Sequence, residues 1–124
     1  MTESNYSWQV QMGGVSITYT IEEKNKMPQR IFITRGKTGS VLTEALKKAG
    51  LQASKSLKNG VPLREVVNAW LDLTSPMVIV EGYSPINEAV SPLDFGARLL
   101  SLEYLADTSF AQTAVDLKKL RCYQ

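Results

Sequence analysis

Residues 34–57 read TRGKTGSVLTEALKKAGLQASKSL. The segment passes from β-prone residues through a glycine-rich turn into a long amphipathic helix. Its apolar residues recur three or four positions apart and form one face, at Leu42, Ala45, Leu46, Ala49, Ala53 and Leu57. We expect this helix to lie on a sheet formed by the strands that precede it.

The turn itself, residues 35–40, is a candidate anion site. Ser40 is placed to cap the helix with its hydroxyl group, and Gly36 and Gly39 allow backbone conformations that other residues resist. Arg35 and Lys37 add two cations beside the N–H groups at the helix N-terminus, which attract anions. We name this turn the glycine corner.

Three strands are predicted before the corner. Apolar and polar residues alternate over 6–12 and again over 15–21, with Gly13-Gly14 between them, which is typical of a β-hairpin. Residues 22–28 are charged and contain a proline, so we expect the next turn there. Residues 29–34 are β-prone and form the third predicted strand.

More helices are predicted after the long one. Gly60 is placed to end the first helix and Pro62 to begin a second, in which Trp70 belongs to the core. Residues 77–80 form an apolar run too short for a helix, either a buried strand or an extended crossing segment.

The C-terminal third begins with a helix start signal at residues 91–94, Ser-Pro-Leu-Asp. The apolar stripe of this helix is wide, which favours an oligomer interface. Asp107 can cap a last short helix whose inward residues are Ala111, Ala114, Leu117 and Leu120. The predicted fold is α+β, an N-terminal antiparallel sheet of about three strands packed against two long helices and shorter helices, in one domain over residues 1–124.

Composition excludes several kinds of chemistry. The chain has no histidine and one cysteine, Cys122, so it can form no intrachain disulfide, no Cys/His zinc site and no histidine-based triad. With 44% hydrophobic and 21% charged residues, no membrane-length apolar run and no signal-peptide pattern, we expect a cytoplasmic protein that does not bind a membrane.

The net charge of +2 hides an asymmetry between two parts of the chain. Residues 26–64 contain nine basic residues and one acidic residue, whereas residues 76–124 contain four basic and six acidic residues. Half of the molecule should therefore present a positive field. The helix lysines have two open interpretations, a binding surface or a solvated face.

Known nucleotide motifs fit poorly. The Gly36-Lys37-Thr38 tripeptide invites a P-loop interpretation, but a P-loop needs glycine at position 31, which is isoleucine inside a strand. No G-x-G-x-x-G sequence occurs. Nucleic acid is not an expected partner, because the lysines follow no helix-turn-helix pattern and the aromatic residues alternate as core residues do.

The chain resembles the TSCPD domain. The resemblance rests on GKTGS at 36–40, LTEAL at 42–46 and NGVPLREVV at 59–67, and it extends through SPLDF at 91–95 and LEYL at 102–105. This domain forms the C-terminal part of many adenosylcobalamin-dependent ribonucleotide reductases and also occurs as free-standing small proteins. The cysteines that give the family its name are missing here, so the resemblance implies no metal.

The layout is also similar to that of phage anti-Thoeris sponge proteins, which sequester cyclic ADP-ribose-like or cyclic oligonucleotide immune signals. From this likeness we hypothesise a non-enzymatic, homo-oligomeric binding protein for an anionic nucleotide, with no cofactor. The candidate ligand-binding residues are Arg35, Lys37, Gly39, Ser40, Tyr83, Asn87 and Arg98. Two alternatives stay open: an accessory or split-off domain of a ribonucleotide reductase, and a structural interaction module.

Overall fold

A long β-hairpin opens the fold in the computed structural model, which describes residues 3–36 and 41–123. Strand β1 (Glu3–Met12) pairs along its whole length with β2 (Val15–Lys24), and Gly13 and Gly14 turn between them with φ of 58° and 78°. Two successive positive φ angles define the tight hairpin turn that glycine adopts without strain. The predicted hairpin is confirmed.

The third strand, β3 (Met27–Arg35), pairs antiparallel with β2. The turn between them is narrower than predicted, because only Asn25 and Lys26 leave the strands, with φ of 55° and 67°. A two-residue turn of this type needs no proline, and Pro28 lies inside β3 next to an irregularity in the register at Glu22 and Glu23.

Two short strands that the sequence analysis did not count complete a five-stranded sheet. They are β4 (Val78–Glu81) and β5 (Glu88–Ala89), and the strand order is β3-β2-β1-β4-β5. Strand β4 pairs with β1 and with β5 through two residue pairs each. Residues 77–79 are exposed and Val80 is buried, so the predicted buried strand is a strand on the surface.

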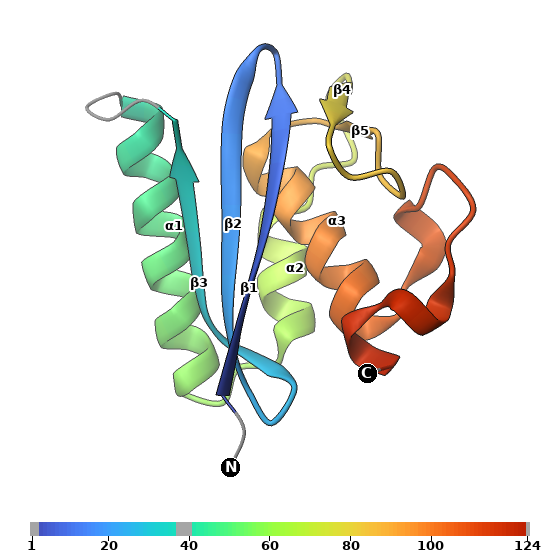
Figure 1. The fold of residues 1–124 in the computed structure, drawn as a ribbon. Coiled ribbons are helices and arrows are strands. Elements are labelled where there is room, and N and C mark those ends of the chain that lie inside the picture. The colour runs from blue at the N-terminus through green and yellow to red at the C-terminus, as the bar shows by residue number, and fades with distance from the viewer. Residues whose placement is uncertain (1–2, 37–40, 124) are drawn as a thin grey trace.

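The α-helices are α1 (Val41–Lys58, 18 residues), α2 (Leu63–Trp70, 8 residues) and α3 (Pro92–Leu105, 14 residues). Helices α2 and α3 lie behind the hairpin in Figure 1, α1 lies alongside β3 at the edge of the sheet, and the other face of the sheet is open toward the viewer. Gly60 ends α1 as predicted: it has φ 85°, and Val61 N–H donates to the Ser56 carbonyl across the helix end.

Helix α1 packs against the open edge of β3. The Ser54 hydroxyl accepts a hydrogen bond from Ile31 N–H at 2.9 Å and donates to the Gly50 carbonyl at 2.8 Å. A Cβ atom on Gly50 would lie 2.7 Å from the Ile31 carbonyl oxygen, so glycine is what allows this close approach. The helix thereby covers backbone groups at which another strand could otherwise pair.

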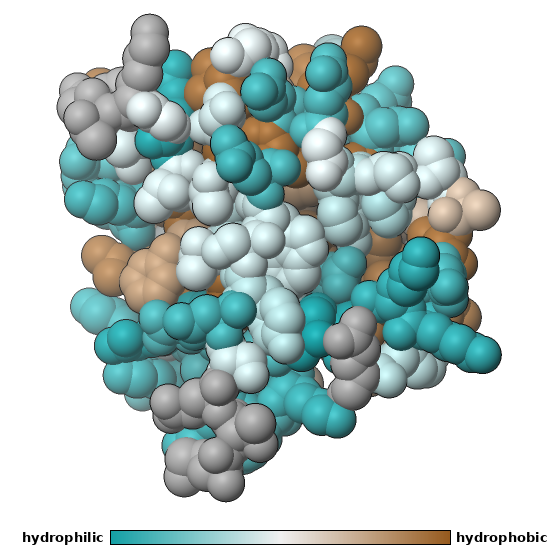
Figure 2. All heavy atoms as spheres, in the orientation of Figure 1, coloured by the Kyte–Doolittle hydropathy of each residue, from teal (hydrophilic) through white to brown (hydrophobic). Residues whose placement is uncertain are grey.

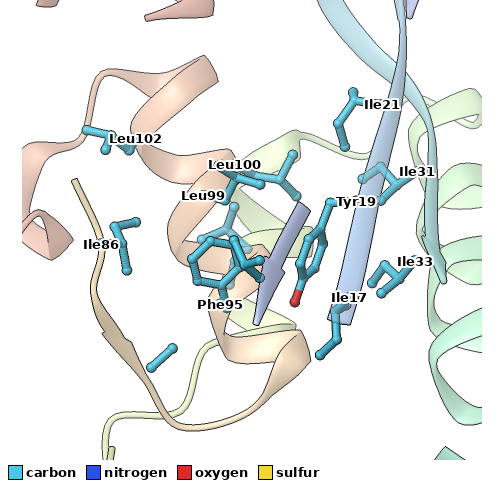
Figure 3. Packing of buried hydrophobic residues seen from close by; sticks show 14 of the residues in the cluster. Ile17, Tyr19, Ile21, Ile31, Ile33, Ile86, Phe95, Leu99, Leu100 and Leu102 are labelled. Atoms are coloured by element: carbon cyan, nitrogen blue, oxygen red, sulfur yellow. The ribbon is translucent and has the colours of Figure 1, made fainter. Parts of the chain in front are cut away.

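Helix α3 is the centre of the core. Residues 94–104 are all buried, and Phe95 packs against Tyr19 of β2 with 5.2 Å between ring centroids, as Figure 3 shows. Trp70 of α2 also contacts this cluster, as predicted. Because the chain itself covers every side of α3 over these residues, the width of its apolar stripe is no argument for a partner subunit.

The C-terminal segment follows α3 as three short 3-10 turns, Thr108–Phe110, Leu117–Lys119 and Arg121–Tyr123. Asp107 caps the first of them, but the predicted last helix is wrong, since Ala114 and Leu117 are exposed. Side-chain caps from Asp107 and Asp116 and hydrogen bonds to the loop before β5 hold the backbone in short turns instead.

Arg121 fixes the end of this segment. Its guanidinium donates to both carboxylate oxygens of Glu23 at 3.0 Å and lies 3.7 Å from the centroid of the Tyr6 ring. The hydrogen bonds to Glu23 raise the pKa of Arg121. The Tyr104 hydroxyl donates to the same carboxylate. The C-terminal segment is therefore attached to β2 through a buried charge pair.

Candidate functional site

The glycine corner is only partly within the described residues. Lys37, Gly39 and Ser40 lie outside them, so their predicted roles stay predictions. Arg35 is the half-buried last residue of β3, opposite Ile17.

Gly36 continues the strand pairing, because its N–H donates to the Ser16 carbonyl at 3.1 Å. Its backbone is not in the left-handed region, and an added Cβ would meet no atom closer than 3.8 Å. Gly36 therefore does not use the backbone freedom that glycine allows.

Arg98, another predicted ligand residue, is buried inside α3. Its Nε donates to Asp94 at 2.8 Å, a terminal nitrogen donates to the Asp72 carbonyl at 3.3 Å, and its guanidinium lies 5.2 Å from the centroid of the Phe110 ring. Only 2% of Arg98 is exposed. Its charge is used within the chain, so the geometry gives it a structural role in place of the predicted contact with a ligand.

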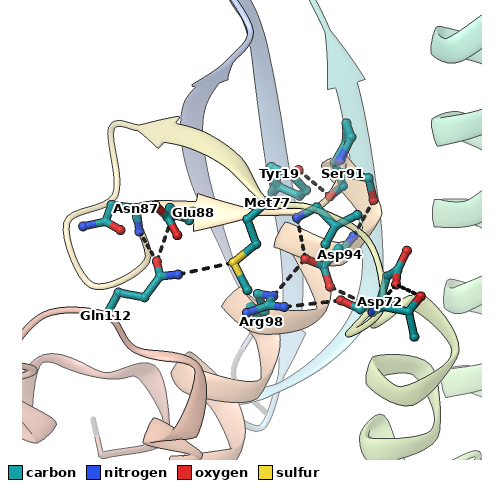
Figure 4. Close-up of polar contacts among 12 residues, drawn as sticks. Tyr19, Asp72, Met77, Asn87, Glu88, Ser91, Asp94, Arg98 and Gln112 are labelled. Carbon is teal, nitrogen blue, oxygen red and sulfur yellow. Dashed lines mark hydrogen bonds and ion pairs between the residues drawn. The ribbon is translucent and has the colours of Figure 1, made fainter.

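Asp94 joins three parts of the chain, as Figure 4 shows. It accepts hydrogen bonds from the backbone N–H groups of Asp72 and Val90, both at 2.8 Å, in addition to the one from Arg98. Its own N–H donates to Ser91, the predicted cap of α3. This buried carboxylate therefore holds the segment after α2, the end of β5 and the start of α3 together.

Tyr83 and Asn87 lie in the loop between β4 and β5. The Tyr83 hydroxyl donates to the buried carboxylate of Glu103, and its ring meets Phe95 edge-on at 6.0 Å between centroids. Burial, followed by the hydrogen bond to Glu103, raises the pKa of Tyr83. Asn87 is exposed. Its backbone N–H donates to the side-chain oxygen of Gln112 and its carbonyl accepts from Val80 N–H, while its side-chain amide points away from Arg98 in Figure 4.

The structure does not bring the described members of this set, Arg35, Arg98 and the loop of Tyr83 and Asn87, into one site. Arg35 pairs with Ile17, Ile17 pairs with Val10, and Gly82 lies against Val10. That row crosses three strand spacings, so Arg35 and the start of the loop of Tyr83 are about 14 Å apart. Within one chain they form separate regions.

A different surface combines cations with hollows, at the junction of β3 and α1. A hollow of about 200 Å³ is lined by Arg30, Phe32, Leu51, Ser54, Lys55 and Lys58. An adjoining hollow of about 500 Å³ is lined by Lys48, Leu51, Gln52, Lys55, Ser56 and Asn59. We name the surface formed by these two linings the basic seam.

The helical spacing explains why the seam is cationic. Lys48, Leu51, Lys55 and Lys58 are three or four residues apart, so they form a row about 15 Å long on one side of α1. Neither lining contains a carboxylate among the described residues, and the three lysines are exposed. Their charges therefore add within these two hollows, and the nearest glutamates, Glu22 and Glu23, line a separate hollow that also includes Arg30 and Lys58.

Arg30 of the seam forms an ion pair on the sheet. Glu22, directly opposite on β2, lies 3.4 Å from it, and both side chains are partly exposed. Exposed pairs of this kind contribute about 0–1 kcal/mol, so Arg30 can exchange this partner for a ligand at little cost.

The sequence contained the signals for this seam, but they were not combined. The sequence leaves the helix lysines open between a binding surface and a solvated face, and it predicts the third strand from β-prone residues without assigning its side chains to faces. Ile31 and Ile33 are buried, so Arg30 and Phe32 must face the other way. Only the contact of α1 with the edge of β3 brings these two patterns together.

A family model identifies the chain. The model of the TSCPD domain matches residues 2–104, which is most of its length. The chain belongs to the TSCPD domain family. Neither the curated proteins nor the solved structures include a match to it.

Two further properties of this TSCPD domain bear on the site. Among residues 3–36 and 41–123, no group of three or more His, Cys, Asp or Glu side chains is arranged to hold a metal ion. No helix in that part of the chain has the length and apolar character needed to cross a bilayer.

Proposed function

We propose that this TSCPD domain is a non-enzymatic binding protein for an anionic nucleotide, and that the basic seam holds the ligand. In a cell such a protein acts as a sponge, which lowers the free concentration of a nucleotide signal such as a cyclic ADP-ribose-like or cyclic oligonucleotide molecule. The observation that carries the proposal is the row of Lys48, Lys55 and Lys58 beside two hollows that no described carboxylate lines.

Physical chemistry favours an anion there. Cations that share a concave surface produce a positive potential that concentrates anions and strengthens each phosphate contact. Lysine and arginine hold phosphate through charge-assisted hydrogen bonds. The arrangement is built for affinity, and the chain has no histidine to act as a general base.

The first test asks whether the ligand is bound and returned unchanged. The purified chain is incubated with cyclic ADP-ribose isomers and cyclic di- and trinucleotides, then separated from free ligand and denatured. Recovery of an intact nucleotide from the denatured protein supports the proposal. Recovery of an altered nucleotide means that the protein is an enzyme, and recovery of none means that it binds none of these ligands.

The second test asks whether the basic seam holds the ligand found in the first. The K55E/K58E variant should bind it at least tenfold more weakly, on the order of 1.4 kcal/mol for the lost charge-assisted contacts. The K47E/K118E variant is the matched control, since it changes net charge equally at two exposed lysines outside the linings. Equal losses in both variants would show a non-specific charge effect.

The family match favours one second candidate. TSCPD domains form part of many adenosylcobalamin-dependent ribonucleotide reductases, so this chain is alternatively an accessory domain that acts with such an enzyme, with the basic seam facing substrate or partner. The neighbouring genes distinguish the two: reductase genes favour the accessory domain, and phage genes favour the sponge.

A further inference from the structure

Phe32 has an unusual position for a large apolar side chain. Its neighbours Ile31 and Ile33 are each 1% exposed and face the core. Because side chains alternate along a strand, Phe32 lies on the open face of the sheet, where it is half-buried and opposite Thr20. Packing in the hydrophobic core therefore does not explain why a phenylalanine occupies this position.

The surroundings of the ring are apolar on one side and cationic on the other. Leu51 of α1, which is 55% exposed, shares the 200 Å³ hollow with Phe32, and Arg30, Lys55 and Lys58 line the same hollow. Figure 2 shows an apolar patch over β3 and α1 with hydrophilic residues directly below it. A ring beside three cations matches a ligand that has an aromatic part and a negative part.

We propose that Phe32 is the stacking platform for the base of the nucleotide, and that Arg30, Lys55 and Lys58 contact its phosphate. This assignment rests on the proposed function and makes it specific, because it requires a base as well as a charge. Bases stack on aromatic side chains whatever their identity, and the phosphate adds charge-assisted hydrogen bonds. The 500 Å³ hollow shares Leu51 and Lys55 with the smaller one and leaves room for the sugar.

The other residues on the open face of the sheet favour a free nucleotide over a nucleic-acid strand as the ligand. Sheets that bind single strands place several aromatic residues on one face, so that successive bases stack. On the open face of this sheet the neighbouring strands instead present Ser7 and Gln9 of β1 and Thr18 and Thr20 of β2. One ring provides a platform for one base.

Calorimetric titration of the full chain with ADP and with pyrophosphate separates the base from the charge. The wild-type chain should bind ADP about tenfold more tightly than pyrophosphate. The Phe32→Ala variant should lose this difference while it binds pyrophosphate as the wild type does. The Phe32→Tyr variant keeps an aromatic ring and should restore the preference, which also shows that the result is not caused by misfolding.

The titrations distinguish failure of the stacking site from failure of the proposed function. Equal binding of ADP and pyrophosphate by the wild type, or an unchanged preference in Phe32→Ala, overturns the stacking site and leaves anion binding intact. No binding of either probe overturns the proposed function as well. A short oligothymidylate that binds more tightly than ADP overturns the assignment to a free nucleotide and identifies a nucleic-acid surface instead.

Discussion

Cationic side chains occupy two contrasting environments in this chain. On the α3 side, Arg98 and Arg121 are buried, and each is hydrogen-bonded to a carboxylate, Asp94 or Glu23. In the basic seam, Lys55 and Lys58 are exposed beside a hollow that no described carboxylate lines. The first pair of cations stabilises the fold, and the second pair is available to a ligand.

This contrast shows that the roles of charged residues cannot be assigned from the sequence alone. Arg98 is predicted from the sequence to contact a ligand, yet it closes a hydrogen-bond network inside the protein. The seam lysines were as easily explained by a solvated helix face. Burial and facing partners, which no single sequence reveals, decide between the two roles. The predictions below test this division, from the largest expected effect to the smallest.

Asp94→Ala should have the largest effect on stability. It leaves the Arg98 charge buried without its carboxylate and removes the acceptor of two backbone N–H groups. We expect the free energy of unfolding in urea to fall by about 3–5 kcal/mol. The exposed Glu44→Ala change serves as the control and should cost about 0.5 kcal/mol or less. A loss below about 1 kcal/mol for Asp94→Ala would contradict the structural role of this pair.

The buried tyrosines should make the protein sensitive to alkali. Burial raises the pKa of Tyr19, Tyr83 and Tyr104, and the neighbouring Glu103 and Glu23 carboxylates raise the pKa of the latter two further. The unfolded chain therefore loses these protons first, so stability present below about pH 10 declines as the pH rises further, by up to about 1.4 kcal/mol per pH unit for each tyrosine.

Denaturant unfolding at a series of pH values measures this decline. The Y83F/Y104F variant cannot ionise at the two positions, so its stability should fall less steeply above about pH 10 than that of the wild type. Lysine ionisation affects both proteins alike and cancels in the comparison. Identical pH profiles would show that these hydroxyls are not protected in the folded state.

Gly50→Ala tests the contact that builds the seam. The new Cβ atom would lie 2.7 Å from the Ile31 carbonyl oxygen, so α1 must move away from β3. Overpacking of this kind costs about 1–3 kcal/mol, partly offset by the better helix propensity of alanine. Nucleotide binding should weaken together with stability, because Lys55 and Phe32 separate.

The matched control for Gly50→Ala is Gly36→Ala, whose Cβ atom meets nothing within 3.8 Å and whose backbone any residue can adopt. It should change stability by less than about 0.5 kcal/mol. If the two alanine variants behave alike, then the close approach of α1 to β3 does not determine the geometry of the seam.

Much of the fold could be predicted from the sequence because its signals are local. The hairpin, the end of α1 at Gly60 and the cap of α3 at Ser91 each depend on a few neighbouring residues. Strand β4 was one of two alternatives left open for residues 77–80, and β5 was missed because it has only two residues and no repeating pattern. The last helix was predicted from apolar spacing, but side-chain caps at Asp107 and Asp116 hold that segment in short turns.

The candidate site was harder to predict because it depends on contacts between distant segments. Arg30 and Lys58 are 28 residues apart and line one hollow only because α1 packs against β3. The sequence-based prediction instead chose the glycine corner, because a local motif can be recognised there from neighbouring residues alone. Its role stays a prediction, and R35A/K37A is the variant that tests it by calorimetry.

Glu22→Gln should have the smallest effect and sharpens the assignment of Arg30. It removes the partner 3.4 Å from Arg30, which should change stability by at most about 1 kcal/mol. Affinity for a nucleotide should rise a few-fold at low salt and return toward the wild-type value at high salt, since screening weakens the competing pair. A fall in affinity would mean that Glu22 positions Arg30 for binding.

The most direct measurement of the central claim is a heteronuclear NMR titration of the labelled chain with ADP. We predict that the backbone amide shifts concentrate at residues 30–32 and 48–58, in the basic seam, and that amides near Arg98 and Arg121 do not move. Shifts confined to the glycine corner, or to the loop of Tyr83 and α3, would contradict the account and return the site to the residues first chosen from the sequence.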